Sequence, residues 1–325
     1  MADRFGLVTR LLEQSTRLRF LRRLNFSHQL LAKHEQQQAL GGGYKSWSND
    51  TLVFEYHVPK RVCVGPGETM PLGALVALID EVTTWVSIGS DRHKRAGVSI
   101  SLEAELSQQD RPPVAGEKLV FSARVEKMGR TIGFQSCDVH EATSGRHIAR
   151  GYHSKYLDMG RAYALAMGPL FPLTERIGRA IGTARPMPLI DPSDAAGLER
   201  LLAPTFVAAE EDHATRGRLS MGFTCLTEHL QETHIMFGGL QAMVHEVAAR
   251  AAADSLHQKS SPPICCAMLV RYLAGSGLGE NLVAEAAAAE AYRGEGFKAT
   301  SRLMRAGAGR GAVRSEAELQ FVRST

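Results

Sequence analysis

The sequence predicts an α+β protein made of two similar units, each with a long helix and an antiparallel sheet. In residues 71–88 apolar side chains recur at steps of three and four, so a helix here can be buried on most sides. Residues 237–254 begin with Phe-Gly-Gly and repeat this pattern, which indicates a second copy of the unit. A chain of 325 residues with 44% hydrophobic composition can form two such cores.

Runs of strand character surround the first helix. One precedes it and four follow it, at residues 51–58, 97–106, 118–127, 131–140 and 147–157. Turn residues such as Pro112, Gly129 and Gly145 separate the later runs at spacings typical of an antiparallel meander. In the second half the runs after the helix are residues 264–273, 281–291, 297–306 and 312–322.

The domain organisation follows from these runs. We expect a basic N-terminal segment, a first unit, a connector and a second unit, at residues 1–45, 46–158, 159–214 and 215–325. The connector is rich in Pro, Gly and Ala and is long for a loop, so we expect a partly ordered crossover. Each unit would leave a sheet edge and a helix flank uncovered, so the two should pack as an intramolecular pseudo-dimer.

An acid, Asp80, interrupts the apolar pattern of the first helix. An ionised carboxylate is costly to remove from water unless it is hydrogen-bonded or charge-paired. Asp80 is therefore either a paired structural group or a base whose pKa the protein adjusts.

The motifs around this helix resemble those of a known enzyme family. They are Met70-Pro71-Leu72-Gly73, Asp80, Gly97-Val98-Ser99, Ala115-Gly116-Glu117, Thr131-Ile132-Gly133-Phe134 and Gly151-Tyr152-His153-Ser154-Lys155. Together they look like the small hotdog acyl-CoA thioesterases of the PaaI-like group. The order of strand, helix and four strands is similar to the hotdog fold, in which an antiparallel sheet wraps one long helix.

This resemblance implies hydrolysis of an acyl-CoA thioester, with CoA as part of the substrate and no separate cofactor. In the family one protomer supplies an Asp base and a Ser, and its partner supplies a Gly N–H and an Asn. Asp80 and Ser99 match the first pair. The chain departs from the pattern where Pro71 and Leu72 replace a His and a Gly, and where Gly65 falls at the Asn position.

Applied to two fused units, the resemblance implies one complete composite site. Asp80 and Ser99 of the first unit would face Gln231 and the Gly238 N–H of the second, and Gly73 and Gly239 would lie where the CoA thioester approaches. The other site would contain Glu246, Cys265, Gly65 and Leu72, and we expect it to be inactive. A shift of one residue would pair Asp80 with His245 instead of Glu246, and the sequence leaves both alignments open.

The positive charge is concentrated at the N-terminus. Residues 1–34 contain seven Lys or Arg and two acids, a net charge of +5 in a chain whose total is +4. Leucines among the arginines can share one helical face, a composition typical of a mitochondrial transit peptide, although an ordinary surface helix has the same composition. We expect the mitochondrial matrix as the location, with the cytoplasm as the alternative.

A second function fits the same features. The chain would then be a catalytically silent double-hotdog subunit of a large mitochondrial assembly such as the ribosome, attached through the basic segment. For either function we also expect a homo-oligomer of pseudo-dimers.

Other classes are disfavoured by absent motifs. Five cysteines without a Cys-x-x-Cys pair indicate neither a disulfide framework nor a zinc site, and we expect no bound metal. The His residues near the motifs, His153, His234 and His245, are expected to be structural. No Gly-x-Ser-x-Gly elbow occurs, and we expect no membrane span.

Overall fold

The computed structural model describes most of both units. The described ranges are residues 42–48, 50–65, 67–107, 111–158, 217–226, 229–230, 235–256, 263–291, 296–307 and 312–323, with single positions at 4, 160, 170, 173 and 176. Nearly all of the N-terminal segment and of the connector, and also Gln231 and His234, lie outside the described residues.

The first unit contains one long helix and six strands. They are β1 (Gly43–Ser48), β2 (Thr51–His57), α4 (Leu72–Ser90), β3 (Val98–Leu106), β4 (Lys118–Met128), β5 (Ile132–Glu141) and β6 (His147–Tyr156), with a short 3-10 turn η2 (Lys60–Val62). The second unit repeats this plan with β7 (Arg218–Thr224), α8 (Gly238–Asp254), β8 (Ile264–Tyr272), β9 (Asn281–Glu290), β10 (Gly296–Arg305) and β11 (Val313–Val322). Each expected helix and strand is present, with ends within two residues of those predicted.

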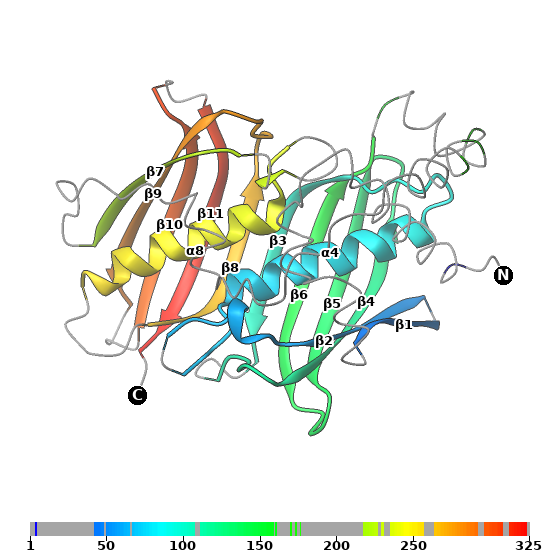
Figure 1. Cartoon of the computed structure of the whole chain (residues 1–325). Helices are drawn as coiled ribbons and strands as arrows, with labels where there is room; N and C mark the ends of the chain where they lie inside the picture. The colour runs from blue at the N-terminus through cyan, green and yellow to red at the C-terminus, as the bar shows by residue number, and fades with distance from the viewer. Residues whose placement is uncertain are drawn as a thin grey trace.

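All eleven strands join one antiparallel sheet in the order β1-β2-β4-β5-β6-β3-β8-β11-β10-β9-β7 (Figure 1). The two units meet where β3 pairs with β8, with Glu103 opposite Leu269 near the middle of the contact. Pairing of the two edges removes both from solvent, which is the physical reason for the pseudo-dimer.

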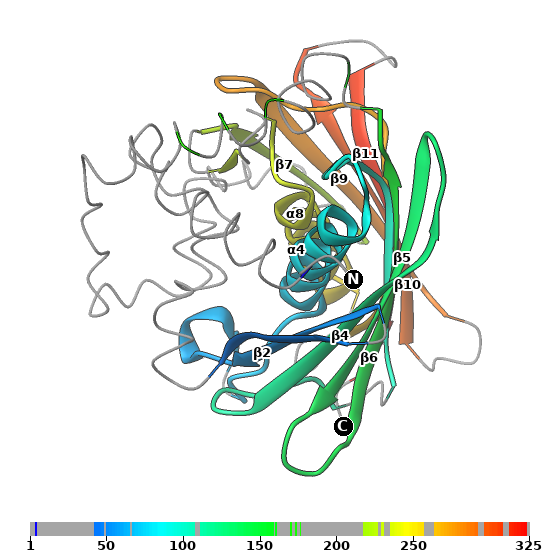
Figure 2. The same ribbon diagram turned by 90° about the vertical axis from the view of Figure 1, so that its right-hand side faces the viewer.

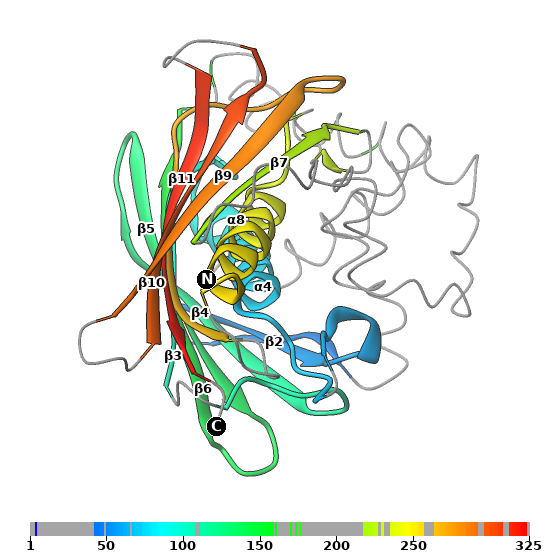
Figure 3. The same ribbon diagram turned by 90° about the vertical axis from the view of Figure 1, so that its left-hand side faces the viewer.

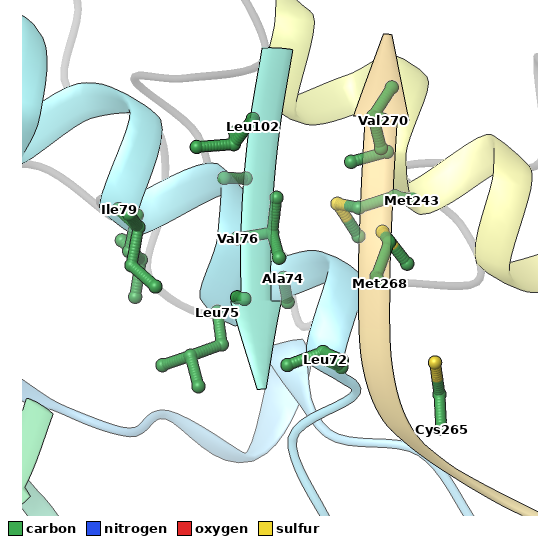
Figure 4. Packing of buried hydrophobic residues seen from close by; sticks show 14 of the residues in the cluster. Leu72, Ala74, Leu75, Val76, Ile79, Leu102, Met243, Cys265, Met268 and Val270 are labelled. Atoms are coloured by element: carbon green, nitrogen blue, oxygen red, sulfur yellow. The ribbon is translucent and has the colours of Figure 1, made fainter. Parts of the chain in front are cut away.

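Helices α4 and α8 lie on the concave side of the sheet and pack against each other (Figures 2 and 3). Near the junction Val76 of α4 lies beside β3, while Met243 of α8 faces Met268 of β8 (Figure 4). One continuous core therefore runs through both units.

The apolar character of α4 follows from this central position. Its 19 residues are long and apolar enough to cross a bilayer, yet 83% of an apolar 18-residue stretch within it is buried inside the protein. Within the described part of the chain it is the one helix with these properties.

Two strands were not expected from the sequence. β7 pairs with β9 just as β2 pairs with β4, so it is the counterpart of β2 in the second unit. β1 forms a hairpin with β2 and has no counterpart among the described residues. Both strands lie at the ends of the sheet, where the half-exposed pattern of an edge strand is weak in sequence.

The outer face of the sheet differs between the units. In the first unit it exposes large apolar side chains on β3, β5 and β6: Val98, Ile100, Ile132, Phe134, Tyr152 and Tyr156. In the second unit it carries ion pairs, such as Arg271 with Glu318 at 2.7 Å and Arg302 with Glu316 at 3.1 Å. The first unit also has such ion pairs on this face, for example Arg150 with Asp138 at 2.6 Å, and the homo-oligomer remains a prediction.

Deletion of residues 1–40 is expected to leave the fold intact. Arg4, the described residue of this segment, pairs with Asp50 at the surface and lies over the ring of Trp47. Exposed ion pairs contribute at most about 1 kcal/mol, so their loss should change thermal unfolding little. Circular dichroism melting of the truncated chain checks this, and loss of cooperative unfolding would contradict it.

Candidate functional site

Asp80 lies halfway along α4, where the N-terminus of α8 crosses it. The Asp80 residue is only 3% exposed. Its carboxylate accepts a hydrogen bond from the backbone N–H of Gly239, in the first turn of α8. A helix N-terminus has unpaired N–H groups and a positive end of the helix dipole, so it favours a carboxylate at this place.

Two glycines allow this close approach of the helices. A Cβ atom on Gly238 would lie 2.9 Å from Asp80 Oδ2. A Cβ on Gly239 would lie 2.6 Å from the Cα of Ala77 on α4, which cannot move without displacing the helix backbone. The Phe-Gly-Gly motif is therefore required by helix packing as well as by the site.

Four polar side chains of the first unit surround Asp80 Oδ1. Ser99 Oγ and Thr84 Oγ1 each lie at 3.5 Å, His153 Nε2 at 3.6 Å and Lys155 Nζ at 3.8 Å. These distances are longer than those of strong hydrogen bonds. Oδ1 is thus surrounded by polar groups without a short bond to any of them.

His153 holds the Ser99 hydroxyl through a defined tautomer. Its Nδ1 lies 2.7 Å from Thr83 Oγ1, which donates to the Ile79 carbonyl at 2.6 Å and so must accept from the imidazole. Burial, reinforced by Lys155, holds the pKa of His153 well below its usual value, so the ring is neutral. Its bare Nε2 then accepts from Ser99 Oγ at 2.9 Å.

Burial and the neighbouring groups have opposite effects on the pKa of Asp80. Burial raises the pKa of its carboxyl, while the charge of Lys155 and then the Gly239 N–H act to lower it. Burial lowers the pKa of Lys155, and Asp80 and Glu81 counteract that effect. A buried carboxyl group whose pKa is shifted by desolvation and by a nearby cation is typical of functional sites.

Tyr272 adds a group from the second unit that sequence reasoning missed. Its hydroxyl donates to the Gly238 carbonyl oxygen at 2.9 Å. Burial, and then the charge of Asp80, raises the pKa of Tyr272 well above its usual value, so the phenol stays neutral. Tyr272 ends β8 and reaches the site only because β3 and β8 pair, so no local motif could reveal it.

The corresponding place in the second unit is chemically different. Glu246 accepts the N–H of Gly73, as Asp80 accepts that of Gly239, so the structure selects Glu246 as the counterpart of Asp80. His245 instead bonds Ser301 and Ser315 at 2.9 Å each, and burial lowers its pKa to about 3.

Strand register identifies the other replacements. Ser99 pairs with Lys155 on the neighbouring strand, and at the same place Cys265 pairs with Phe321. Arg250, four residues after Glu246, binds the Glu246 carboxylate directly. The second unit therefore has no counterpart of the Ser99 hydroxyl or of Lys155 at this place, and Arg250 forms an ion pair with its buried acid.

The remaining predicted residues have mixed outcomes. Gln231 lies outside the described residues, so its role stays a prediction. The N–H groups of Gly73 and Gly239, which we expected beside CoA, bind carboxylates. Gly65 lies in a turn at φ +70° and Leu72 is buried.

The second unit also has a surface hollow that lies away from these residues. A hollow of about 610 Å³ on the outer face of the second unit contains none of the predicted site residues, and its arginines include the paired Arg271 and Arg302. Among the described residues no group of three His, Cys, Asp or Glu side chains could hold a metal ion.

Comparisons with known proteins agree with this architecture. No family model matches the chain. The 12:0-ACP thioesterase from Umbellularia californica superposes with a TM-score of 0.55 at 13% identity, over 83% of this chain and 93% of that one. The tesB protein of Mycobacterium avium subs paratuberculosis gives 0.55 at 11% identity, over 86% and 95%. At these identities the similarity establishes the fold.

A sequence relative links this fold to thioesterases. Acyl-coenzyme A thioesterase 13 of Mus musculus is 32% identical over 89 residues, which are 27% of this chain and 61% of the relative, and the Homo sapiens protein gives the same values. The chain has the double-hotdog fold, and this part of its sequence is similar to acyl-CoA thioesterases. The match spans only about 61% of the length of these relatives.

In this double hotdog the two places between the helices are unequal. The Asp80 place combines side chains of β3 and β6 with the start of α8, whereas the Glu246 place is closed by Arg250 and apolar neighbours. The two places thus differ in their side chains, and the expectation of one active and one inactive site stays a prediction.

Proposed function

We propose that the chain hydrolyses acyl-CoA thioesters at one composite site around Asp80. The single observation that carries this proposal is the position of a buried carboxylate between the Ser99–His153 pair of the first unit and the N-terminus of α8 from the second. The sequence relatives, named as acyl-CoA thioesterases, support the substrate class.

In the proposed reaction a water molecule lies between Asp80 Oδ1 and Ser99 Oγ. Its two hydrogens point to these oxygens, which directs a lone pair at the thioester carbon. Asp80 takes one proton as the water oxygen bonds to that carbon. Because Ser99 donates to His153, its own oxygen remains available to accept from the water.

The carbonyl oxygen of the substrate gains negative charge during this attack. We assign its stabilisation to the N-terminus of α8, where the Gly238 N–H has no intrahelical acceptor. Collapse of the tetrahedral intermediate breaks the carbon–sulfur bond. The thiolate leaves with the proton from Asp80, so that one thioester and one water give an acid and a thiol.

The test is hydrolysis of a panel of short- and long-chain acyl-CoA thioesters, measured as the release of free thiol. The same acyl groups on acyl carrier protein form a parallel panel, because one structural relative is an ACP thioesterase. We expect turnover of at least one acyl-CoA. Purified, folded protein that hydrolyses neither panel would instead favour the silent subunit.

Tyr272→Phe is expected to lower turnover modestly. The change removes one hydrogen bond to the Gly238 carbonyl and leaves the ring, and a neutral hydrogen bond contributes about 0.5–1.5 kcal/mol. Turnover should therefore fall by about two- to tenfold. Tyr156→Phe, on the exposed outer face, is the control and should retain full activity. Equal rates in both variants would exclude a role for Tyr272.

The location and the partner are part of the same proposal. We infer that residues 1–45 direct the protein to the mitochondrial matrix, on the basis of their +5 charge within residues 1–34. Fractionation of cells that express the full and the truncated chain tests this. Recovery with a large particle such as the ribosome, in stoichiometric amounts, would support the silent subunit instead.

A further inference from the structure

We propose that Lys155 is a positioning residue that keeps Asp80 ionised in its buried site without occupying the oxygen that must accept a proton. This inference rests on the proposed function and adds to it a residue of β6 that neither the motif assignments nor the comparisons assign a role.

Lys155 is buried, with a side chain 3% exposed, so a structural reason for its charge is needed. Its Nζ donates to Thr84 Oγ1 at 2.8 Å, and Thr84 lies one turn beyond Asp80 on α4. Nζ is 3.8 Å from Asp80 Oδ1, too long for a hydrogen bond but close enough for strong attraction between the charges.

In a direct ion pair Lys155 would both stabilise the charge of Asp80 and occupy its acceptor oxygen, whereas here it does only the first. The ammonium stabilises the carboxylate form, while the hydrogen bond that it donates goes to Thr84 and not to Oδ1, so a lone pair of Oδ1 stays free. A general base needs such a lone pair. The Thr84 hydroxyl in turn donates to the Asp80 backbone carbonyl at 2.7 Å, which fixes the point where Lys155 is anchored.

The second unit provides an internal comparison. There Phe321 takes the place of Lys155, and Arg250 takes the place of Thr84. The buried acid again has one cation, but Arg250 donates straight to the Glu246 carboxylate. In the second unit the cation therefore occupies an oxygen of Glu246, whereas in the first unit Lys155 leaves Oδ1 of Asp80 free. Both cations compensate the charge of the acid, but only the arrangement in the first unit leaves the carboxylate available as a base.

The pH dependence of this site depends on the titratable groups that surround Asp80. His153 and Lys155 approach from β6 and Tyr272 from β8, while Glu81 on α4 acts on Lys155. Ser99 of β3 and the Gly239 N–H of α8 do not titrate in the working range. His153 is neutral and Tyr272 is protonated, so Lys155 is the one cation that these elements direct at Asp80.

The sign of the effect follows. An opposite charge at 3.8 Å favours the ionised acid, so removal of Lys155 should raise the pKa of Asp80 further. The acid limb of kcat/KM, which requires ionised Asp80, should then move to higher pH by about one to three units. At the high-pH plateau the rate should approach that of the wild type.

The experiment measures kcat/KM against pH for the wild type and for Lys155→Met, Lys155→Arg and Thr84→Val. Lys155→Arg keeps the charge and should restore the acid limb toward its original position. Thr84→Val keeps the lysine but removes its anchor, so a smaller shift is expected. Lys127→Met, on the exposed part of β4, is the matched control and should leave the profile unchanged.

A second readout does not depend on activity. In protein labelled with ¹³C at the aspartate carboxyls, the Asp80 resonance is identified by its loss in Asp80→Asn, and its titration midpoint is compared between wild type and Lys155→Met. A raised midpoint supports the inference. An unchanged midpoint in a folded variant, or an equal loss of rate at every pH, overturns it. If the wild type hydrolyses no thioester, the proposed function fails, and the resonance still tests the pairing.

Discussion

Asp80→Asn is expected to lower the turnover of acyl-CoA hydrolysis by about a hundredfold or more. The amide keeps the shape of the side chain but cannot take a proton from water, and general bases contribute about 10²–10⁴ in rate. Its stability should fall as well, because the amide leaves the buried Lys155 ammonium without its opposite charge, so the assay belongs well below the melting temperature. Steady-state hydrolysis and thermal unfolding, measured on the same preparation, check both expectations.

Glu246→Gln is the matched control in the second unit. Its turnover per folded molecule should stay near that of the wild type, because Arg250 already occupies this acid. Its stability should fall, since breaking a buried ion pair leaves the other charge without compensation. The assay therefore belongs well below the melting temperature. Equal catalytic losses in Asp80→Asn and Glu246→Gln would refute the model of one composite site.

Gly239→Ala is expected to impair both stability and activity. The new methyl group would meet the Cα of Ala77 at 2.6 Å, so α4 and α8 must separate. Overpacking of this kind costs about 1–3 kcal/mol, and the Gly239 N–H would also move away from Asp80. Denaturant unfolding and acyl-CoA hydrolysis measure the two effects.

Gly222→Ala provides the comparison for this change. Gly222 lies in β7, and its nearest atom to a new Cβ would be at 3.9 Å, an ordinary contact. Stability and turnover should therefore remain close to the wild type. If Gly239→Ala were equally harmless, the close crossing of the two helices would not be a requirement of the site.

The sequence alone determined the two long helices, the strands that follow each of them, and the duplication of this unit. Apolar side chains at three- and four-residue steps can be buried only on a helix, so α4 and α8 were predictable from periodicity. The position of Asp80 within such a helix marked it for attention, because buried carboxylates need partners. Resemblance to the hotdog thioesterases then gave the fold, which the structure and its comparison with solved double hotdogs confirm.

Only the tertiary structure decided which groups meet at Asp80. Lys155 and His153 are distant in sequence and reach it through strand register, and Tyr272 reaches it through the pairing of β3 with β8. The choice between Glu246 and His245 also needed the fold, since a shift of one residue preserves the local pattern of an apolar helix. A periodicity shows that a face is buried, whereas the identity of its partners depends on contacts between segments far apart in the chain.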